Sequence, residues 1–250
     1  MKTTITLMAA VILFFATVFH LHAQSPTGEE ILARIDDNMS SDSRIVSSKM
    51  VIHSRRSSRT IQSKSWMEGE KKAFTEYLFP ARERGTKMLK LEDKLWMYSP
   101  STDRTIHISG HMLRQSVMGS DLSYEDMMED PKLTNHYIAE VTGEETIDGH
   151  ECWVIGLTAK TRDIAYHKRR LWVDKQKYIP LKQELYAKSG KLLKRMKLED
   201  IARIKDRWYP KKMTFKDMLK TGKGTEFLVG TIEFDIDIPD HIFSKAALRK

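Results

Sequence analysis

The sequence predicts a mainly-β protein built on one curved antiparallel sheet, preceded by a short helix. From residue 45 onward, apolar and polar side chains alternate in short runs that are rich in aromatic and β-branched residues. This alternation is typical of strands that bury one face. Turn dipeptides such as Asp148-Gly149 separate the runs, and strands joined by such tight turns must be antiparallel.

Residues 1–23 have the pattern of a cleavable signal peptide. Lys2 supplies the positive start, an apolar run extends from Ile5 to Phe19, and Leu21-His22-Ala23 precedes the expected cut. The run is shorter than the roughly 20 residues that span a bilayer, so an uncleaved anchor is the less favoured alternative. We therefore expect export from the cytoplasm and a mature part, residues 24–250, that folds as one domain.

Charge and cysteine content limit the partners that this chain can have. The formal net charge is +8, but the basic residues are interspersed with acidic ones, which indicates a solvated sheet face or attraction to anionic lipid headgroups. Export separates the chain from most nucleic acid, so we expect no nucleic-acid partner. The single cysteine, Cys152, lies in a predicted strand and is expected to be a buried thiol without a disulfide.

A helix is predicted over residues 28–39. Thr27-Gly28-Glu29-Glu30 matches a capping box, with the threonine at the N-cap and the last glutamate at position N3. Apolar residues follow at helical spacing and form one stripe: Ile31, Leu32, Ile35 and Met39. The stripe indicates a helix packed on a core or, as a more specific hypothesis, a lid over an apolar cleft.

About ten strands are expected from the period-two pattern. The predicted strands cover residues 45–52, 61–67, 73–79, 94–98, 151–158, 170–174, 178–186, 191–198, 209–215 and 225–234. A flat sheet of this width would expose long edges and an apolar face, so it should curl into a full or partial barrel. Strand side chains fill the resulting hollow, or else a helix or an apolar ligand does.

Residues 110–130 interrupt the strand pattern. Ser123 is expected to cap a short helix that begins at Tyr124, with Asp126 at position N3, and Asp130-Pro131 should end it. The segment also holds the one dense acidic cluster of the sequence, which we expect to be exposed: Asp121, Glu125, Asp126, Glu129 and Asp130. Acid-base catalysis by these carboxylates is the hydrolase alternative.

Sequence motifs of enzymes and metal sites are missing. The sequence has no HExxH, GxSxG, Walker or GxGxxG motif. His107 and His111 are four residues apart, but a predicted strand and the break at Gly110 keep them off a common helix face. We therefore expect no enzyme activity, no catalytic residue, no metal and no cofactor.

Several segments resemble the LolA-like family of outer-membrane lipoprotein-sorting proteins. They are LWMYSP at 95–100, ISGHML at 108–113, GSDLSYED at 119–126, and LWVD at 171–174 followed by YIPL at 178–181. The resemblance implies an unclosed β-barrel with short helices covering its concave face. It also implies a monomeric periplasmic carrier that holds acyl chains of lipids or lipoproteins on their way to the outer membrane, between an inner-membrane donor complex or transporter and an outer-membrane acceptor. A lipid-binding sensor that acts through a protein partner is the alternative.

The methionine-rich region between residues 88 and 118 supplies the candidate binding residues, because methionine adapts to variable apolar partners. The expected lipid-binding residues are Met88, Leu95, Met97, Ile106, Ile108, Met112, Leu113 and Met118. The last three belong to the expected movable cover, together with the lid residues Ile31, Leu32 and Ile35.

Overall fold

The computed structural model describes residues 25–249, so the predicted signal peptide lies outside the described part of the chain. The helical elements are α1 (Gly28–Met39), η1 (Gly110–Arg114), η2 (Val117–Gly119), α2 (Tyr124–Met128), η3 (Leu133–Asn135), η4 (Asp240–Phe243) and η5 (Lys245–Arg249), where η denotes a 3₁₀ helix. The strands are β1 (Ser43–His53), β2 (Ser58–Glu68), β3 (Lys72–Phe79), β4 (Lys87–Leu91), β5 (Lys94–Ser99), β6 (Arg104–Ile108), β7 (Tyr137–Ile147), β8 (His150–Ala159), β9 (Lys168–Asp174), β10 (Pro180–Tyr186), β11 (Leu192–Ile204), β12 (Arg207–Asp217) and β13 (Gly224–Phe234).

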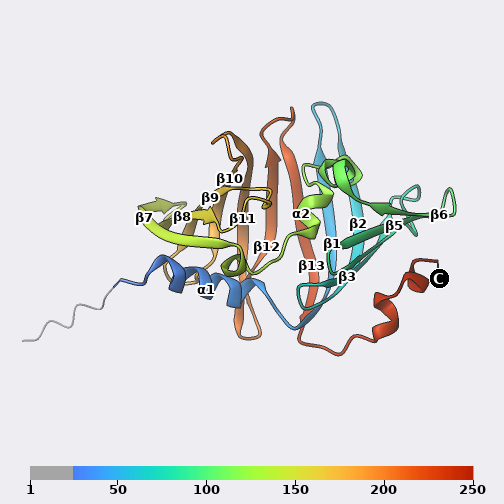
Figure 1. Cartoon of the computed structure of the whole chain (residues 1–250), viewed down its shortest axis with the longest axis horizontal. Helices are drawn as coiled ribbons and strands as arrows, with labels where there is room; N and C mark the ends of the chain where they lie inside the picture. Colours follow the sequence, from blue (N-terminus) through green and yellow to red (C-terminus); the bar gives the residue numbers. More distant parts are fainter. Residues whose placement is uncertain (1–24, 250) are drawn as a thin grey trace, which may run out of the picture.

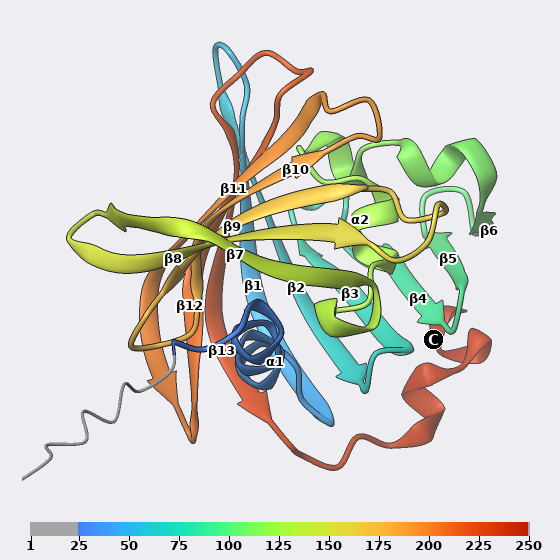
Figure 2. The same cartoon turned by 60° about the vertical axis from the view of Figure 1, so that its left-hand side comes forward.

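All these strands form one 13-stranded sheet in the order β6-β5-β4-β3-β2-β1-β13-β12-β11-β10-β9-β8-β7. The chain starts in the middle of the sheet at β1 and runs outward as a meander to the edge strand β6. It then crosses to the other edge strand, β7, and returns by a second meander to β13, which pairs antiparallel with β1. Within residues 25–249, β6 and β7 are not paired with each other, so the strongly curved sheet is not closed (Figure 2). The predicted fold class is confirmed.

Residues 109–136, which we call the crossing segment, connect the two edges of the sheet. They contain η1, η2, α2 and η3 and lie across the concave side, where α2 is drawn in front of the central strands (Figure 1). The predicted capping box of α2 is present, with the Ser123 side chain accepting from the backbone N–H of Asp126 and the Asp126 carboxylate accepting from the backbone N–H of Ser123. The crossing segment is therefore an ordered cover of the concave face.

Helix α1 covers a different part of the concave face, beside β7, β8 and β9. Its predicted bounds and its capping box between Thr27 and Glu30 are confirmed. Three residues of the apolar stripe are buried, with Ile31 and Leu32 at 0% and Ile35 at 2% exposure, and Met39 is partly buried. The stripe packs into a cluster with Leu133 of the crossing segment and with residues of β7 to β9. These strand residues are Tyr137, Ala139, Trp153, Ile155, Leu157, Leu171 and Val173.

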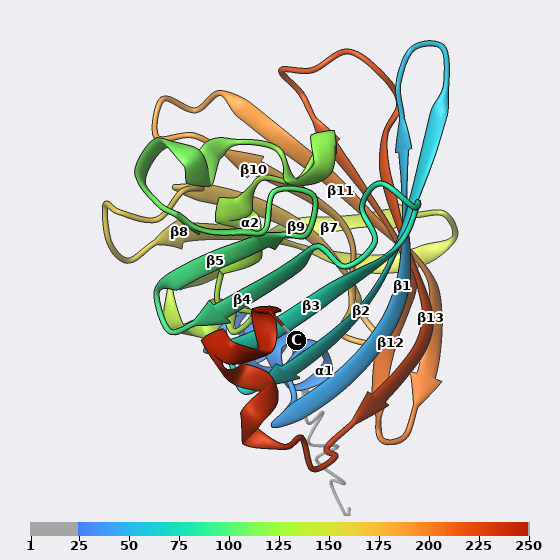
Figure 3. The ribbon, with the colours of Figure 1, turned by 90° about the vertical axis from the view of Figure 1, so that its right-hand side faces the viewer.

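The convex face of β3 to β5 is covered by the C-terminal residues 235–249. Ile238, Phe243 and Leu248 pack against Phe74 and Leu89 of the sheet, and the C-terminal segment lies outside these strands in Figure 3. The sheet is therefore covered on both faces at this end. Because both faces are buried, the side chains that point to either face are apolar there.

Candidate functional site

An apolar cluster on the concave face is shared between the sheet and the crossing segment, and we call it the methionine cluster. Its buried members are Met50, Ile61, Tyr77, Met88, Leu95, Ile108, Val117 and Tyr124. The last two come from the crossing segment, and the others come from β1 to β6. Partly buried residues packed against them include Met97, Met112, Leu113, Met118, Leu122, Met127 and Met128.

The structure brings most of the predicted lipid-binding residues into this cluster. Met88, Leu95 and Ile108 are each 2% exposed, and cross-strand pairing places Met97 opposite both Met88 and Ile106. Ile106 lies on the outermost strand and is 37% exposed, so it marks the rim of the cluster rather than its interior. Lipid binding by these residues stays a prediction.

The predicted lid residues of α1 lie outside the methionine cluster. Ile31, Leu32 and Ile35 belong to the separate cluster formed with β7 to β9. We expected the lid residues to cover one common wall with Met112, Leu113 and Met118, and the structure instead places the two sets in different clusters. The physical reason is the docking of α1, which backbone contacts and hydrogen bonds fix next to β7.

Helix α1 approaches the sheet so closely that its first residue must lack a side chain. A Cβ atom added to Gly28 would lie 2.5 Å from the backbone oxygen of Ala139. At the other end of the helix, the buried carboxylate of Asp36 accepts hydrogen bonds from the backbone N–H groups of Leu133 and Thr134, both at 2.9 Å. Burial raises the pKa of Asp36, although these hydrogen bonds act in the opposite direction.

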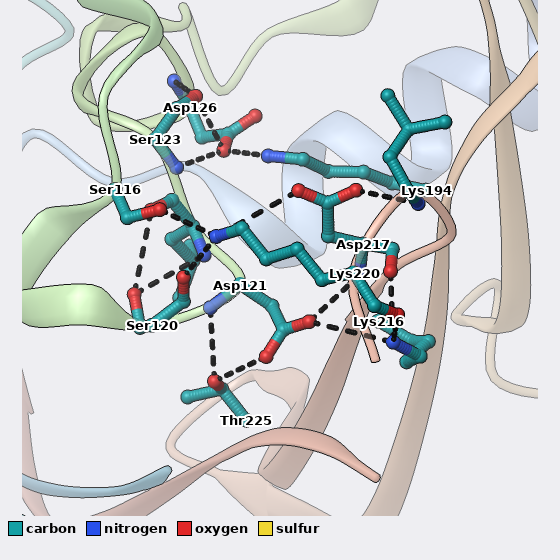
Figure 4. Close-up of polar contacts among 12 residues, drawn as sticks. Ser116, Ser120, Asp121, Ser123, Asp126, Lys194, Lys216, Asp217, Lys220 and Thr225 are labelled. Carbon is teal, nitrogen blue, oxygen red and sulfur yellow. Dashed lines mark hydrogen bonds and ion pairs between the residues drawn. The ribbon is translucent and has the colours of Figure 1, made fainter. Parts of the chain in front are cut away.

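Polar contacts hold the crossing segment above the sheet. The Asp126 carboxylate accepts hydrogen bonds from the Lys194 ammonium and from the Tyr166 hydroxyl. These contacts are drawn in part in Figure 4, where Lys194 points from β11 towards Asp126. Burial alone would raise the pKa of Asp126, but the charge of Lys194 and the hydrogen bonds lower it below its ordinary value.

A second anchor joins the crossing segment to β12, β13 and the loop between them. The Asp121 carboxylate accepts hydrogen bonds from the Thr225 hydroxyl at 2.8 Å and from the backbone N–H of Asp217 at 2.9 Å (Figure 4). The Lys220 ammonium donates to the backbone oxygen of Ser120 at 2.6 Å. The anchor therefore satisfies polar groups of the crossing segment with partners from distant parts of the sequence.

The expected exposure of the acidic cluster is wrong. Asp121 is 7% exposed, and the Asp126 side chain is 12% exposed. No local pattern indicates their partners, because Lys194 and Thr225 lie 68 and 104 residues further along the chain. Paired with cations and hydroxyls in this way, the carboxylates act as anchors of the cover, which gives the hydrolase alternative no support.

A cavity of about 290 Å³ remains between the crossing segment, α1 and the sheet. Its walls combine apolar side chains, such as Leu185, Met196 and Phe215, with the charged side chains of Asp126, Arg169 and Lys194. A wider cleft of about 680 Å³ lies on the other side of α2 and includes Lys90 and Leu113. The interior is therefore partly open on both sides of α2.

Two kinds of site are missing from the part of the chain that the structure describes. No group of three or more histidine, cysteine or acidic side chains in residues 25–249 is arranged to hold a metal ion. None of the helices in the same range has the length and apolar character needed to cross a lipid bilayer.

Comparisons with known proteins identify the family. A family model described as "Uncharacterized protein" matches residues 69–250. A DUF1329 family protein from Desulfovibrio piger has a similar structure, with a TM-score of 0.81 and 25% identity over 88% of this chain and 97% of that one. A LolA superfamily protein from Nitrosomonas europaea gives a TM-score of 0.72 and 26% identity over 89% of this chain and 100% of that one. The chain belongs to the matched family, and it is LolA-like.

A third structure supports the same assignment of the LolA-like fold. It is a domain from Vibrio parahaemolyticus described as an outer membrane lipoprotein-sorting protein, with a TM-score of 0.76 and 25% identity. The alignment covers 89% of this chain and 98% of that domain. No curated protein sequence matches the chain.

Sequence reasoning missed the buried cations of this LolA-like chain. Each lies two residues from a buried or partly buried apolar residue of the same strand and therefore shares its side of the sheet. These pairs are Lys90 with Met88, Arg169 with Leu171, and Lys194 with Met196. The signal that could have identified them is a lysine or arginine at a strand position that alternation places on the same face as the buried apolar residues.

Proposed function

We propose that this protein is a periplasmic carrier or chaperone that binds acyl chains of lipids or lipoproteins and shields them on the way to the outer membrane. One observation carries the proposal: non-strand residues cover the apolar concave face of a LolA-like sheet. The methionine cluster is completed by Val117 and Tyr124 of the crossing segment, and such a cover can be exchanged for cargo without unfolding the sheet. The role needs no catalytic chemistry.

The space beneath the cover limits the cargo that can bind while the crossing segment stays in place. At about 290 Å³, the cavity lies at the lower end of the roughly 300–1,000 Å³ typical of small-molecule sites. An acyl chain that lies on the methionine cluster requires the crossing segment to move away, because Val117 and Tyr124 of that segment already pack there. Shielding an acyl chain from water is favourable by about 0.8 kcal/mol per CH₂ group. The acyl chain and the apolar residues of the crossing segment compete for the same apolar wall, so one can replace the other.

The crossing segment, rather than α1, supplies the movable cover in this proposal. Glu29 of α1 accepts a hydrogen bond from the backbone N–H of Ala139 in β7 at 2.8 Å, and Gly28 lies against the same backbone. By contrast, the crossing segment is a chain of short helical turns that is anchored by side-chain ion pairs. Periplasmic location is supported by the predicted signal peptide and by the LolA-like fold.

Lipid retention tests this proposal. The chain should be purified after export with mild handling, and native mass spectrometry and lipid extraction should then reveal bound acyl lipid. Met97→Lys places a charge in the partly buried edge of the methionine cluster and should abolish retention, whereas Ile138→Lys, at a position that is 52% exposed, should retain it. Circular dichroism should show that both variants remain folded.

Transfer of a fluorescent acyl lipid from donor to acceptor vesicles tests the carrier role directly. The purified chain should accelerate transfer in proportion to its concentration, and Met97→Lys should not. Retention of lipid without any transfer would favour the sensor alternative. A folded protein that neither retains nor transfers acyl lipid would disprove the carrier proposal.

A further inference from the structure

Three cationic side chains are buried on the concave face, close to the apolar surface. Lys90 of β4, Arg169 of β9 and Lys194 of β11 are 8%, 5% and 8% exposed, respectively. Lysine and arginine are almost never buried to this extent unless they are paired, because moving a charge out of water is unfavourable. Their position therefore requires a local source of negative charge or hydrogen-bond acceptors.

The crossing segment supplies all three partners from within α2 and the residue that follows it. Lys194 pairs with the Asp126 carboxylate, and Arg169 pairs with the Glu129 carboxylate. Lys90 donates a hydrogen bond to the backbone oxygen of Met128 at 3.1 Å. The cover thus compensates the buried charges of the sheet as well as shielding its apolar residues.

Arg169 retains unused capacity to bind an anion. Its Nε atom is buried and has no hydrogen-bond partner among the residues that the structure describes, whereas its Nη2 atom is in contact with the Glu129 carboxylate. The guanidinium lies 4.8 Å from the ring centroid of Tyr137 and 5.4 Å from that of Tyr166. These rings fix its orientation beside the 290 Å³ cavity.

The cations and the apolar surface are adjacent, which is the arrangement that an amphiphile requires. Arg169 and Lys194 line the same cavity as Leu185, Met196 and Phe215. Lys90 lines the cleft on the other side of α2, together with Leu113 and Met128. When the crossing segment moves, an acyl chain on the methionine cluster therefore has cationic side chains next to one of its ends.

We propose that the cargo carries an anionic headgroup, a phosphate or a carboxylate, which takes the positions held by the Asp126 and Glu129 carboxylates in the covered state. This inference rests on the proposed function, because it specifies the cargo of the same site. Neutral cargo that displaced the cover would leave buried cations without partners, which is strongly unfavourable. Anionic cargo restores the ion pairs, and an arginine with a free donor suits bidentate recognition of carboxylate or phosphate.

Amphiphiles with one tail and different headgroups test this inference. Tridecanoic acid, monododecyl phosphate and dodecyl maltoside share a twelve-carbon alkyl tail, and each can be titrated below its micelle concentration by isothermal calorimetry. We expect at least one of the anionic probes to bind about tenfold more tightly than the maltoside, or better. The stronger of the two anionic probes identifies the source of the negative charge.

A charge-neutral variant with its cover retained provides the matched comparison. Asp126→Asn combined with Lys194→Met removes one ion pair without leaving either charge unpaired, and the preference for anionic probes should fall by about tenfold. Lys197→Met removes one positive charge from the exposed side of the same strand and should keep the wild-type preference.

The outcomes separate this inference from the proposed function. Equal affinity of the wild-type chain for neutral and anionic probes would overturn the headgroup assignment and leave the carrier proposal intact. An undiminished preference in the folded double variant would overturn it as well. If no twelve-carbon probe binds, the carrier proposal fails together with the headgroup assignment.

Discussion

Replacing Asp126 by alanine should destabilise the protein far more than a typical surface substitution. The change removes the partner of Lys194, the acceptor of the Tyr166 hydroxyl and one half of the α2 capping box. Lys194 would stay buried with an uncompensated charge, and breaking a buried pair in this way costs about 3–5 kcal/mol. We expect the free energy of unfolding to fall by about that amount.

A double-mutant cycle isolates the ion pair from the other contacts of Asp126. Lys194→Met should cost less than Asp126→Ala, because the remaining carboxylate keeps its hydrogen bonds with Ser123 and Tyr166. The double variant leaves no unpaired charge, so its loss should be smaller than the sum of the two single losses by about 2 kcal/mol. Urea unfolding at pH 7, followed by tryptophan fluorescence, measures all four proteins.

The same cycle on an exposed pair is the control. Lys71 and Glu92 are 2.9 Å apart, but their side chains are 69% and 64% exposed, so their coupling energy should stay below about 1 kcal/mol. If the losses at Asp126 and Lys194 are additive within about 0.5 kcal/mol, the buried pair does not anchor the crossing segment and the reasoning is refuted.

Two further predictions concern acid stability and the docking of α1. The pKa of Asp126 is lowered on folding, so its contribution to stability is complete above the ordinary value near pH 4 and is lost as the pH falls through the lower folded value. Asp126→Asn should therefore flatten the decrease in melting temperature between about pH 5 and pH 3, and an unchanged slope would contradict this. Gly28→Ala should cost about 1–3 kcal/mol, because the new Cβ atom meets the Ala139 backbone at 2.5 Å. Thermal unfolding should show no comparable loss for Gly143→Ala on β7, where nothing lies within 4 Å of the added atom, and equal losses would count against the close approach.

Features of the fold that depend only on residues close together in the sequence could be predicted. Both capping boxes, at Thr27 and Ser123, are confirmed with the expected partners. The Asp148-Gly149 turn joins β7 and β8 with φ angles of 50° and 84°, the left-handed conformation that such hairpin turns require. In each case the signal and the structure lie within a few residues of each other.

Strands without a clear alternation of polarity were missed. The edge strand β7 is exposed over most of its length, so no apolar period marks it. In β4, three consecutive residues are buried, and one of them is Lys90, which removes the expected alternation. The pairing of β1 with β13 and the depth of the acidic cluster depend on contacts between distant segments, which local patterns do not report.

The strand order has a consequence for how this chain folds. Because β1 completes its pairing only with the last strand, β13, one edge of β1 stays open until nearly the whole polypeptide is present. Each meander can form from local hairpins, but the contact that unites them has a high sequence separation and should form late. An open strand edge invites pairing with another chain, so fragments that end before β13 should aggregate.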